Sequence, residues 1–180
     1  MSEFEYLAVF ISVIFGIGLT RALTGLFRLV YWGVIDHTRT ILTVYLLFVM
    51  LINWWAAFSW QSEQTWSFEL FLVIIFWSIA HYLAAVALYP PQMRDTETQS
   101  EYRINWVLWA LIGISVADIL QTAERGALFS PWYYLPFVLH FVVLQLLAIF
   151  LIKQELCRWL IWYFLVVLVV WSFVVRRFLT

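Results

Sequence analysis

Six long apolar stretches run almost end to end through this chain of 180 residues, and nearly all charged residues lie in the short gaps between them. Hydrophobic residues make up 65% of the sequence and charged residues 12%, whereas a soluble domain has about 25% charged residues. So few charges cannot cover a surface in water, but apolar side chains can face lipid. The pattern therefore predicts an integral membrane protein.

Each stretch is about as long as a helix that crosses a hydrocarbon core of ~30 Å. The stretches cover residues 6–30, 41–60, 68–89, 104–122, 132–152 and 156–175. Continuously apolar runs such as 160–170 favour helices, because barrel strands alternate apolar and polar residues. The longest gap, 91–103, is too short for a second domain. We therefore predict an all-α fold: one polytopic domain, 1–180, that forms a bundle of six transmembrane helices.

Polar residues and prolines mark several of the expected helix ends. Ser2 and Glu5 have the spacing of a capping box at the first helix. Pro90 is expected to end the third helix, because proline cannot continue one. Ser130 and Pro131 have the form of an N-cap and a first helical residue for the fifth helix.

The distribution of Lys and Arg predicts the orientation of the bundle. Cytoplasmic loops carry an excess of these residues. One side of the predicted bundle has seven and the other has three. The larger set is Arg21, Arg28, Arg39, Arg94, Arg103, Lys153 and Arg158, and the smaller set is Arg125, Arg176 and Arg177. Both termini are therefore expected outside (N-out/C-out).

Several classes of function lack their usual signals. The net charge is −1, so no basic face offers itself to nucleic acid. The one cysteine, Cys157, excludes an intrachain disulfide and a cysteine metal cluster. The motifs G-x-x-x-x-G-K-[ST], H-E-x-x-H and G-x-S-x-G do not occur. We predict no catalytic residues and no metal site, and we favour a non-enzymatic protein while leaving an enzyme open.

The fourth stretch carries the most unusual polar residues. Helical spacing places Ser115, Asp118, Gln121, Thr122 and Arg125 on one side of it. A charge inside a membrane is costly and often functional. Such a stripe can line a water-filled vestibule or carry protons. The alternative is that Asp118 is a structural anchor, paired with an Arg or a hydroxyl on a neighbouring helix.

The first stretch has a face of small residues that ends in positive charge. Gly18, Ala22 and Gly25 share this face with Arg21 and Arg28. Small residues four apart let another helix approach closely. The face predicts close helix packing beside a positive inner end. The alternative is an anion or carboxylate contact at Arg21.

Three further polar residues are expected inside the membrane. His81 and His140 can be packing residues that form hydrogen bonds, a protonatable group together with Asp118, or the two axial ligands of a haem. Asn53 is expected to form an interhelical hydrogen bond rather than to bind a ligand. No cofactor is predicted, and haem is kept as an alternative.

The favoured hypothesis is a proton or small-cation channel or transporter that uses the polar stripe of the fourth helix. Its candidate residues are Asp118, Ser115, Gln121, Thr122, His81, His140, Arg21 and Asn53. The alternatives are a non-catalytic accessory subunit of a membrane complex and a haem-binding or other cofactor-bearing membrane protein. The expected partners are the lipid bilayer and copies of the chain or other membrane subunits. The compact chain is expected in a bacterial inner membrane.

Overall fold

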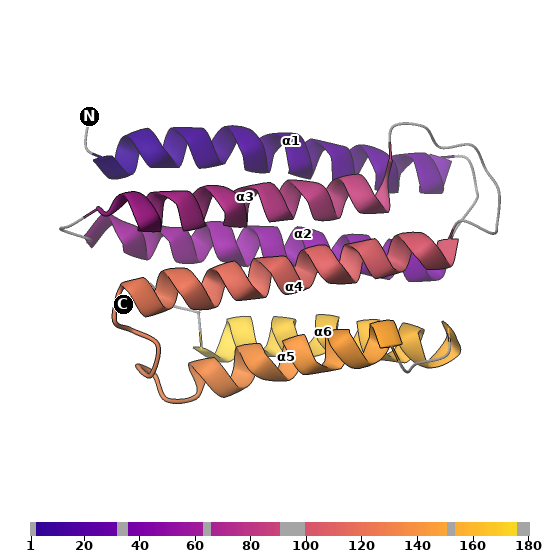
Figure 1. Ribbon diagram of the computed structural model, residues 1–180. Coiled ribbons are helices and arrows are strands. Elements are labelled where there is room, and N and C mark those ends of the chain that lie inside the picture. Colours follow the sequence, from indigo (N-terminus) through magenta and orange to yellow (C-terminus); the bar gives the residue numbers. More distant parts are fainter. Residues whose placement is uncertain (1–2, 32–35, 63–65, 91–99, 151–153, 176–180) are drawn as a thin grey trace.

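The protein is described from a computed structural model, which covers residues 3–31, 36–62, 66–90, 100–150 and 154–175 (Figure 1). These ranges contain six α-helices, one short 3-10 helix and no strand. The elements are α1 (Glu3–Tyr31), α2 (His37–Ala57), η1 (Phe58–Ser62), α3 (Phe68–Leu88), α4 (Ser100–Glu124), α5 (Tyr134–Phe150) and α6 (Gln154–Val175). The all-helical prediction is confirmed for the described residues.

Within the described ranges, four segments are long and apolar enough to cross a membrane. They are Glu3–Tyr31, His37–Gln61, Phe68–Leu88 and Ile104–Glu124. Two further apolar segments, Tyr134–Phe150 and Arg158–Val174, are shorter. The 17 residues of α5 extend about 26 Å, which is near the lower limit of ~17 residues for a span. The described residues therefore contain four full-length candidate spans. Helix α5 is shorter, and the stretch Arg158–Val174 is the apolar part of α6, which has 22 residues.

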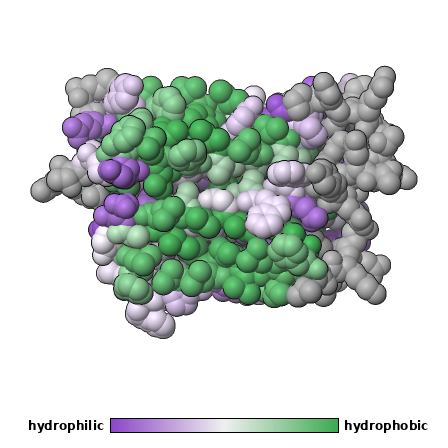
Figure 2. Space-filling model, in the orientation of Figure 1, coloured by the Kyte–Doolittle hydropathy of each residue, from purple (hydrophilic) through white to green (hydrophobic). Residues whose placement is uncertain are grey.

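Consecutive helices run antiparallel, and α3 packs against α1, α2 and α4 (Figure 1). Helix α5 packs on α4, and α6 packs on both α2 and α5. Charged residues gather at the two ends of the bundle. The end with Glu3, Glu5, Glu69 and Glu124 is called the acidic end, and the end with Arg28, Arg39 and Arg158 is called the basic end. Between them the visible face is largely hydrophobic (Figure 2).

The helix starts are fixed by local side chains. The carboxylate of Asp36 accepts hydrogen bonds from the backbone amides of Thr38 and Arg39 at the start of α2. The Ser67 hydroxyl accepts one from the Leu70 amide at the start of α3. Ser2 lies outside the described residues.

The predicted start of the fifth helix is wrong. Helix α5 begins at Tyr134, and Pro131 lies in the turn before it. The reason is local: the Tyr134 amide bonds to the Pro131 carbonyl three residues back, in a turn. The Phe137 amide bonds to the Tyr133 carbonyl with the four-residue spacing of an α-helix.

The small residues of the predicted α1 face pack directly on α3, as their spacing predicted, whereas Arg28, which was expected on the same face, is exposed. Gly18 lies against the backbone of Tyr82, where a Cβ would come within 3.4 Å of the Tyr82 Cα. Ala22 is fully buried. Gly25 lies against the aromatic ring of Tyr89 so closely that a Cβ would overlap it. Only small residues allow this approach of the two helices.

Candidate functional site

The polar row of α4 converges on Asp118. The Gln121 amide nitrogen donates to Asp118 Oδ1 at 2.7 Å. The phenol of Tyr134, from the first turn of α5, donates to Asp118 Oδ2 at 2.7 Å. Asp118 lies six residues before Glu124, about 9 Å from the acidic end of α4. The carboxylate is thus held across a helix interface, by two uncharged donors.

Further oxygen atoms surround the same phenol. The Tyr134 hydroxyl lies 3.1 Å from the Asp118 backbone oxygen and 3.1 Å from the Thr122 hydroxyl. Because the phenol donates its single proton along the shorter contact to the carboxylate, the Thr122 hydroxyl acts as donor to Tyr134. Gln121 Oε1 is buried and has no hydrogen-bond partner among the described residues. We call Asp118, Gln121, Thr122 and Tyr134 the Asp118 cluster.

The remaining members of the predicted stripe lie at its two ends. The Ser115 hydroxyl donates to the Leu111 carbonyl of its own helix at 3.2 Å, so it does not join the Asp118 cluster. Arg125 Nε donates to the Gln121 backbone oxygen at 3.2 Å. Its guanidinium lies 5.8 Å from the ring centre of Trp60, a cation–π contact. Arg125 therefore closes the acidic end of the row.

His81 forms a separate polar centre between α1, α2 and α3. It is fully buried. Its Nδ1–H donates to the Trp77 carbonyl at 2.7 Å, and its Nε2 accepts from the Asn53 amide at 2.9 Å. A carbonyl can only accept and an amide nitrogen can only donate, so this arrangement requires a neutral imidazole that is protonated at Nδ1 and not at Nε2. The ring of Phe15 covers it, with centroids 4.6 Å apart. The predicted interhelical hydrogen bond of Asn53 is confirmed.

Arg21 caps the end of α3. Its Nε donates to the Tyr89 carbonyl at 2.7 Å. The last carbonyls of a helix lack intrahelical hydrogen-bond donors and carry partial negative charge. A guanidinium supplies both a donor and a positive charge. The Tyr89 phenol lies 2.7 Å from the Thr43 hydroxyl, whose proton is donated to the Arg39 carbonyl. The phenol is therefore the donor, and burial raises the pKa of Tyr89 above its ordinary value. Tyr89 thus joins α1, α2 and α3 near the basic end.

His140 lies between α5 and α6. Its Nε2 accepts from the Tyr163 hydroxyl at 2.8 Å, and its Nδ1 lies 3.3 Å from the Phe137 carbonyl, to which it donates. The described contacts of Asp118, His81 and His140 therefore involve three different sets of neighbours. The sequence hypothesis that these groups form one protonatable unit gains no support from this geometry.

The histidines also lack the arrangement of a haem site. A bis-histidine haem needs two ring nitrogens directed at one iron. Nε2 of His81 is engaged by α2, and Nε2 of His140 by α6. Each would have to leave its hydrogen bond to become a ligand. Among the described residues, no group of three His, Cys, Asp or Glu side chains is placed to hold a metal ion.

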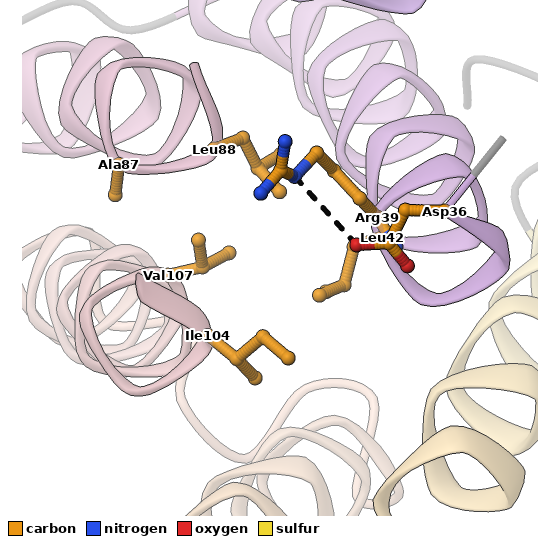
Figure 3. Close-up of a pocket in the computed structure, with 7 residues that line it drawn as sticks. All are labelled: Asp36, Arg39, Leu42, Ala87, Leu88, Ile104 and Val107. Carbon is orange, nitrogen blue, oxygen red and sulfur yellow. Dashed lines mark hydrogen bonds and ion pairs between the residues drawn. The ribbon is translucent and has the colours of Figure 1, made fainter. Parts of the chain in front are cut away.

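A small depression lies at the basic end, and it is too small for a large ligand (Figure 3). It contains about 260 Å³ of empty space, including its open mouth. Its lining is mostly aliphatic: Asp36, Arg39, Leu42, Ala87, Leu88, Ile104 and Val107. Arg39 and Asp36 face each other there with an N–O separation of 3.9 Å. Asp36 already caps α2, so this pair is part of the fold.

Comparisons with protein-family models, with curated proteins and with solved structures find no match. What is known of the molecule therefore comes from its own structure. Where the structure describes the chain, it is all-helical, with four long candidate membrane spans and a carboxylate held between α4 and α5.

Sequence reasoning missed the two tyrosines that organise these sites. Tyr134 and Tyr89 are aromatic residues at helix ends, a position that membrane-interface packing explains equally well. A usable signal for Tyr134 was the short connection from α4, because it forces the start of α5 to lie beside the end of α4. For Tyr89 the signal was its place directly before Pro90, where a helix ends and leaves carbonyls without partners.

Proposed function

We propose that the protein is a six-span integral membrane protein that binds and moves protons or small cations, with Asp118 as the binding group. The observation that carries the proposal is the pairing of the Asp118 carboxylate with uncharged donors, the Gln121 amide and the Tyr134 phenol. A carboxylate at this depth is stabilised by a compensating positive charge. Among the described residues no cationic side chain forms an ion pair with it, and a proton or a small cation fills that role.

The composition of the Asp118 cluster favours a small, hard cation over an organic one. Its candidate ligands are the Asp118 carboxylate and backbone carbonyl, the hydroxyls of Thr122 and Tyr134, and the buried Oε1 of Gln121. Hard cations prefer oxygen ligands of these types. The cluster lies near the acidic end, where carboxylates such as Glu69 raise the local cation concentration.

Movement across the bundle needs a step beyond binding. Inward from Asp118, the side of α4 that packs in the bundle is apolar, with Val107, Leu108 and Leu111 buried. Transport through one copy therefore requires the helices to separate there. An axis between several copies would supply an alternative path, and in this proposal the partners are further copies of the same chain.

The proposal includes an orientation and a location. The excess of Lys and Arg at the basic end supports a cytoplasmic position for that end and N-out/C-out topology. In a bacterium the all-helical fold supports the inner membrane, because spanning proteins of the outer membrane are barrels.

Flux measurements test this function. Wild type, Asp118→Asn and Glu124→Gln are reconstituted in liposomes, and proton and alkali-cation flux are followed. We expect flux in wild type, loss in Asp118→Asn and retention in Glu124→Gln, which alters an exposed carboxylate on the same helix. Absence of flux from wild type at all pH values, or equal flux in all three proteins, would contradict the proposal.

A second candidate function is that of an accessory subunit, and it rests on α6. This helix exposes a wide apolar face that includes Trp162, Val166, Val170 and Phe173. Lipid or a partner helix can cover such a face. Native mass spectrometry of protein extracted gently from its own membrane distinguishes the two: a co-purifying membrane subunit supports this role, and an isolated chain contradicts it.

A further inference from the structure

The outward surface of α1 carries a continuous row of small and polar residues. Ser12, Gly16, Thr20, Thr24 and Arg28 follow one another at intervals of four, and all five are exposed. Residues spaced by four form one ridge line along a helix. A Cβ added at Gly16 would meet nothing within 4 Å. The row is therefore an exposed strip of short side chains along the helix that ends in a positive charge.

The basic end of this row has the donors of a phosphate site. Arg21, Thr24 and Arg28 are spaced by three and four residues, so they share one side of α1. Arg21 Nε is engaged by the Tyr89 carbonyl, which holds the guanidinium in place. No acceptor in the described part of the chain bonds to the terminal nitrogens of Arg21. Within the described residues, no acceptor or acidic side chain bonds to Arg28 or to the Thr24 hydroxyl.

The hydroxyls closer to the middle of the helix are already satisfied. Ser12 Oγ donates to the Ala8 carbonyl at 2.6 Å, and Thr20 Oγ1 donates to the Gly16 carbonyl at 2.7 Å. This part of the row therefore needs no polar partner. It suits a hydrocarbon chain, while the Arg21–Thr24–Arg28 part suits an anion.

We propose that this surface of α1 binds one anionic phospholipid, with its phosphate between Arg21 and Arg28 and an acyl chain along Ser12, Gly16 and Thr20. Two guanidiniums and a hydroxyl match a phosphodiester, which accepts hydrogen bonds and carries negative charge. A second copy packed in parallel on the same row would bring the two Arg28 side chains together, and like charges oppose that contact. Charge thus selects the lipid over a two-fold dimer.

Lipid binding to purified protein tests the site, independently of any transport activity. Native mass spectrometry counts the lipids retained from mixed micelles that contain phosphatidylglycerol or phosphatidylcholine. We expect wild type to retain one phosphatidylglycerol in preference to phosphatidylcholine. Arg28→Gln should bind it about fivefold more weakly, since a basic residue near a membrane contributes about that factor.

Two further variants make the result specific. Arg158→Gln removes an exposed arginine from the same end but from α6, and it should bind like wild type. Thr24→Val keeps every charge and should weaken retention of phosphatidylglycerol. Equal losses in Arg158→Gln and Arg28→Gln would show attraction by general charge and overturn the proposal. Equal retention of the two lipids, or a dimer that excludes lipid, would also overturn it.

Discussion

Tyr134 donates its phenolic proton to the carboxylate of Asp118 across 2.7 Å, and so fastens the first turn of α5 to the last third of α4. The same phenol is within 3.1 Å of the Thr122 hydroxyl. One aromatic side chain thus sets both the position of α5 and the surroundings of the deepest described carboxylate. Helix packing and the chemistry of the Asp118 cluster are therefore coupled.

This coupling predicts the effect of Tyr134→Phe. The variant keeps the ring but removes a donor to a charged group, so thermal unfolding in detergent should show a loss of about 1–2 kcal/mol. Proton or cation flux should change as well, because Asp118 loses one of its two donors. Tyr133→Phe is the matched control, since Tyr133 contacts Trp171 through its ring. Equal stability of the two variants would show that the hydrogen bond has no net effect.

The buried pair of His81 and Asn53 should be energetically coupled. Removing either partner leaves the other polar group buried without its bond, so His81→Leu and Asn53→Leu should each destabilise the protein by about 1–3 kcal/mol. The double variant should cost less than the two losses added together, with a coupling of about 0.6–2 kcal/mol. Chemical unfolding of the four proteins in mixed micelles measures this cycle. Strict additivity would mean that the two side chains do not interact.

Close contact between α1 and α3 makes two glycines on one helix respond differently. In Gly25→Ala the new methyl group would overlap the Tyr89 ring, and overpacking of this kind costs about 1–3 kcal/mol. In Gly16→Ala the methyl group enters open space, so stability should stay equal or rise by up to about 1 kcal/mol from helix propensity. Melting temperatures of the two variants check the contrast. A Gly25→Ala protein as stable as wild type would contradict the described contact.

Much of this architecture follows from the sequence, because apolar length and charge placement are properties of single segments. The order and approximate bounds of the helices, and the shared side of Asp118, Gln121 and Thr122, depend only on helical spacing. Spacing likewise predicted that Gly18 and Gly25 lie at a helix contact. Such periodic patterns involve only the residues of a single helix, so the sequence shows them directly.

The partners between helices could not be predicted in the same way. That Tyr134 meets Asp118, or that Asn53 meets His81, depends on how far one helix is shifted along another, which no single-helix pattern specifies. The acceptor of Arg21 is a backbone carbonyl, and every residue has one, so side-chain identity gave no signal. The predicted start of α5 was wrong because the Tyr134 amide forms a turn with the Pro131 carbonyl, and the helix begins only after that turn.

Because Arg21 caps α3 and Arg28 does not, the two arginines should differ in their contribution to stability. Arg21→Gln removes a donor from the Tyr89 carbonyl and a positive charge from the C-terminal end of α3, which should cost about 1–2 kcal/mol. Arg28→Gln alters an exposed side chain and should leave unfolding in neutral detergent unchanged. Thermal unfolding by circular dichroism without added lipid separates the two. If both variants melt like wild type, the Arg21–Tyr89 bond does not support α3, and its effect on Arg21 would be limited to holding the guanidinium in place.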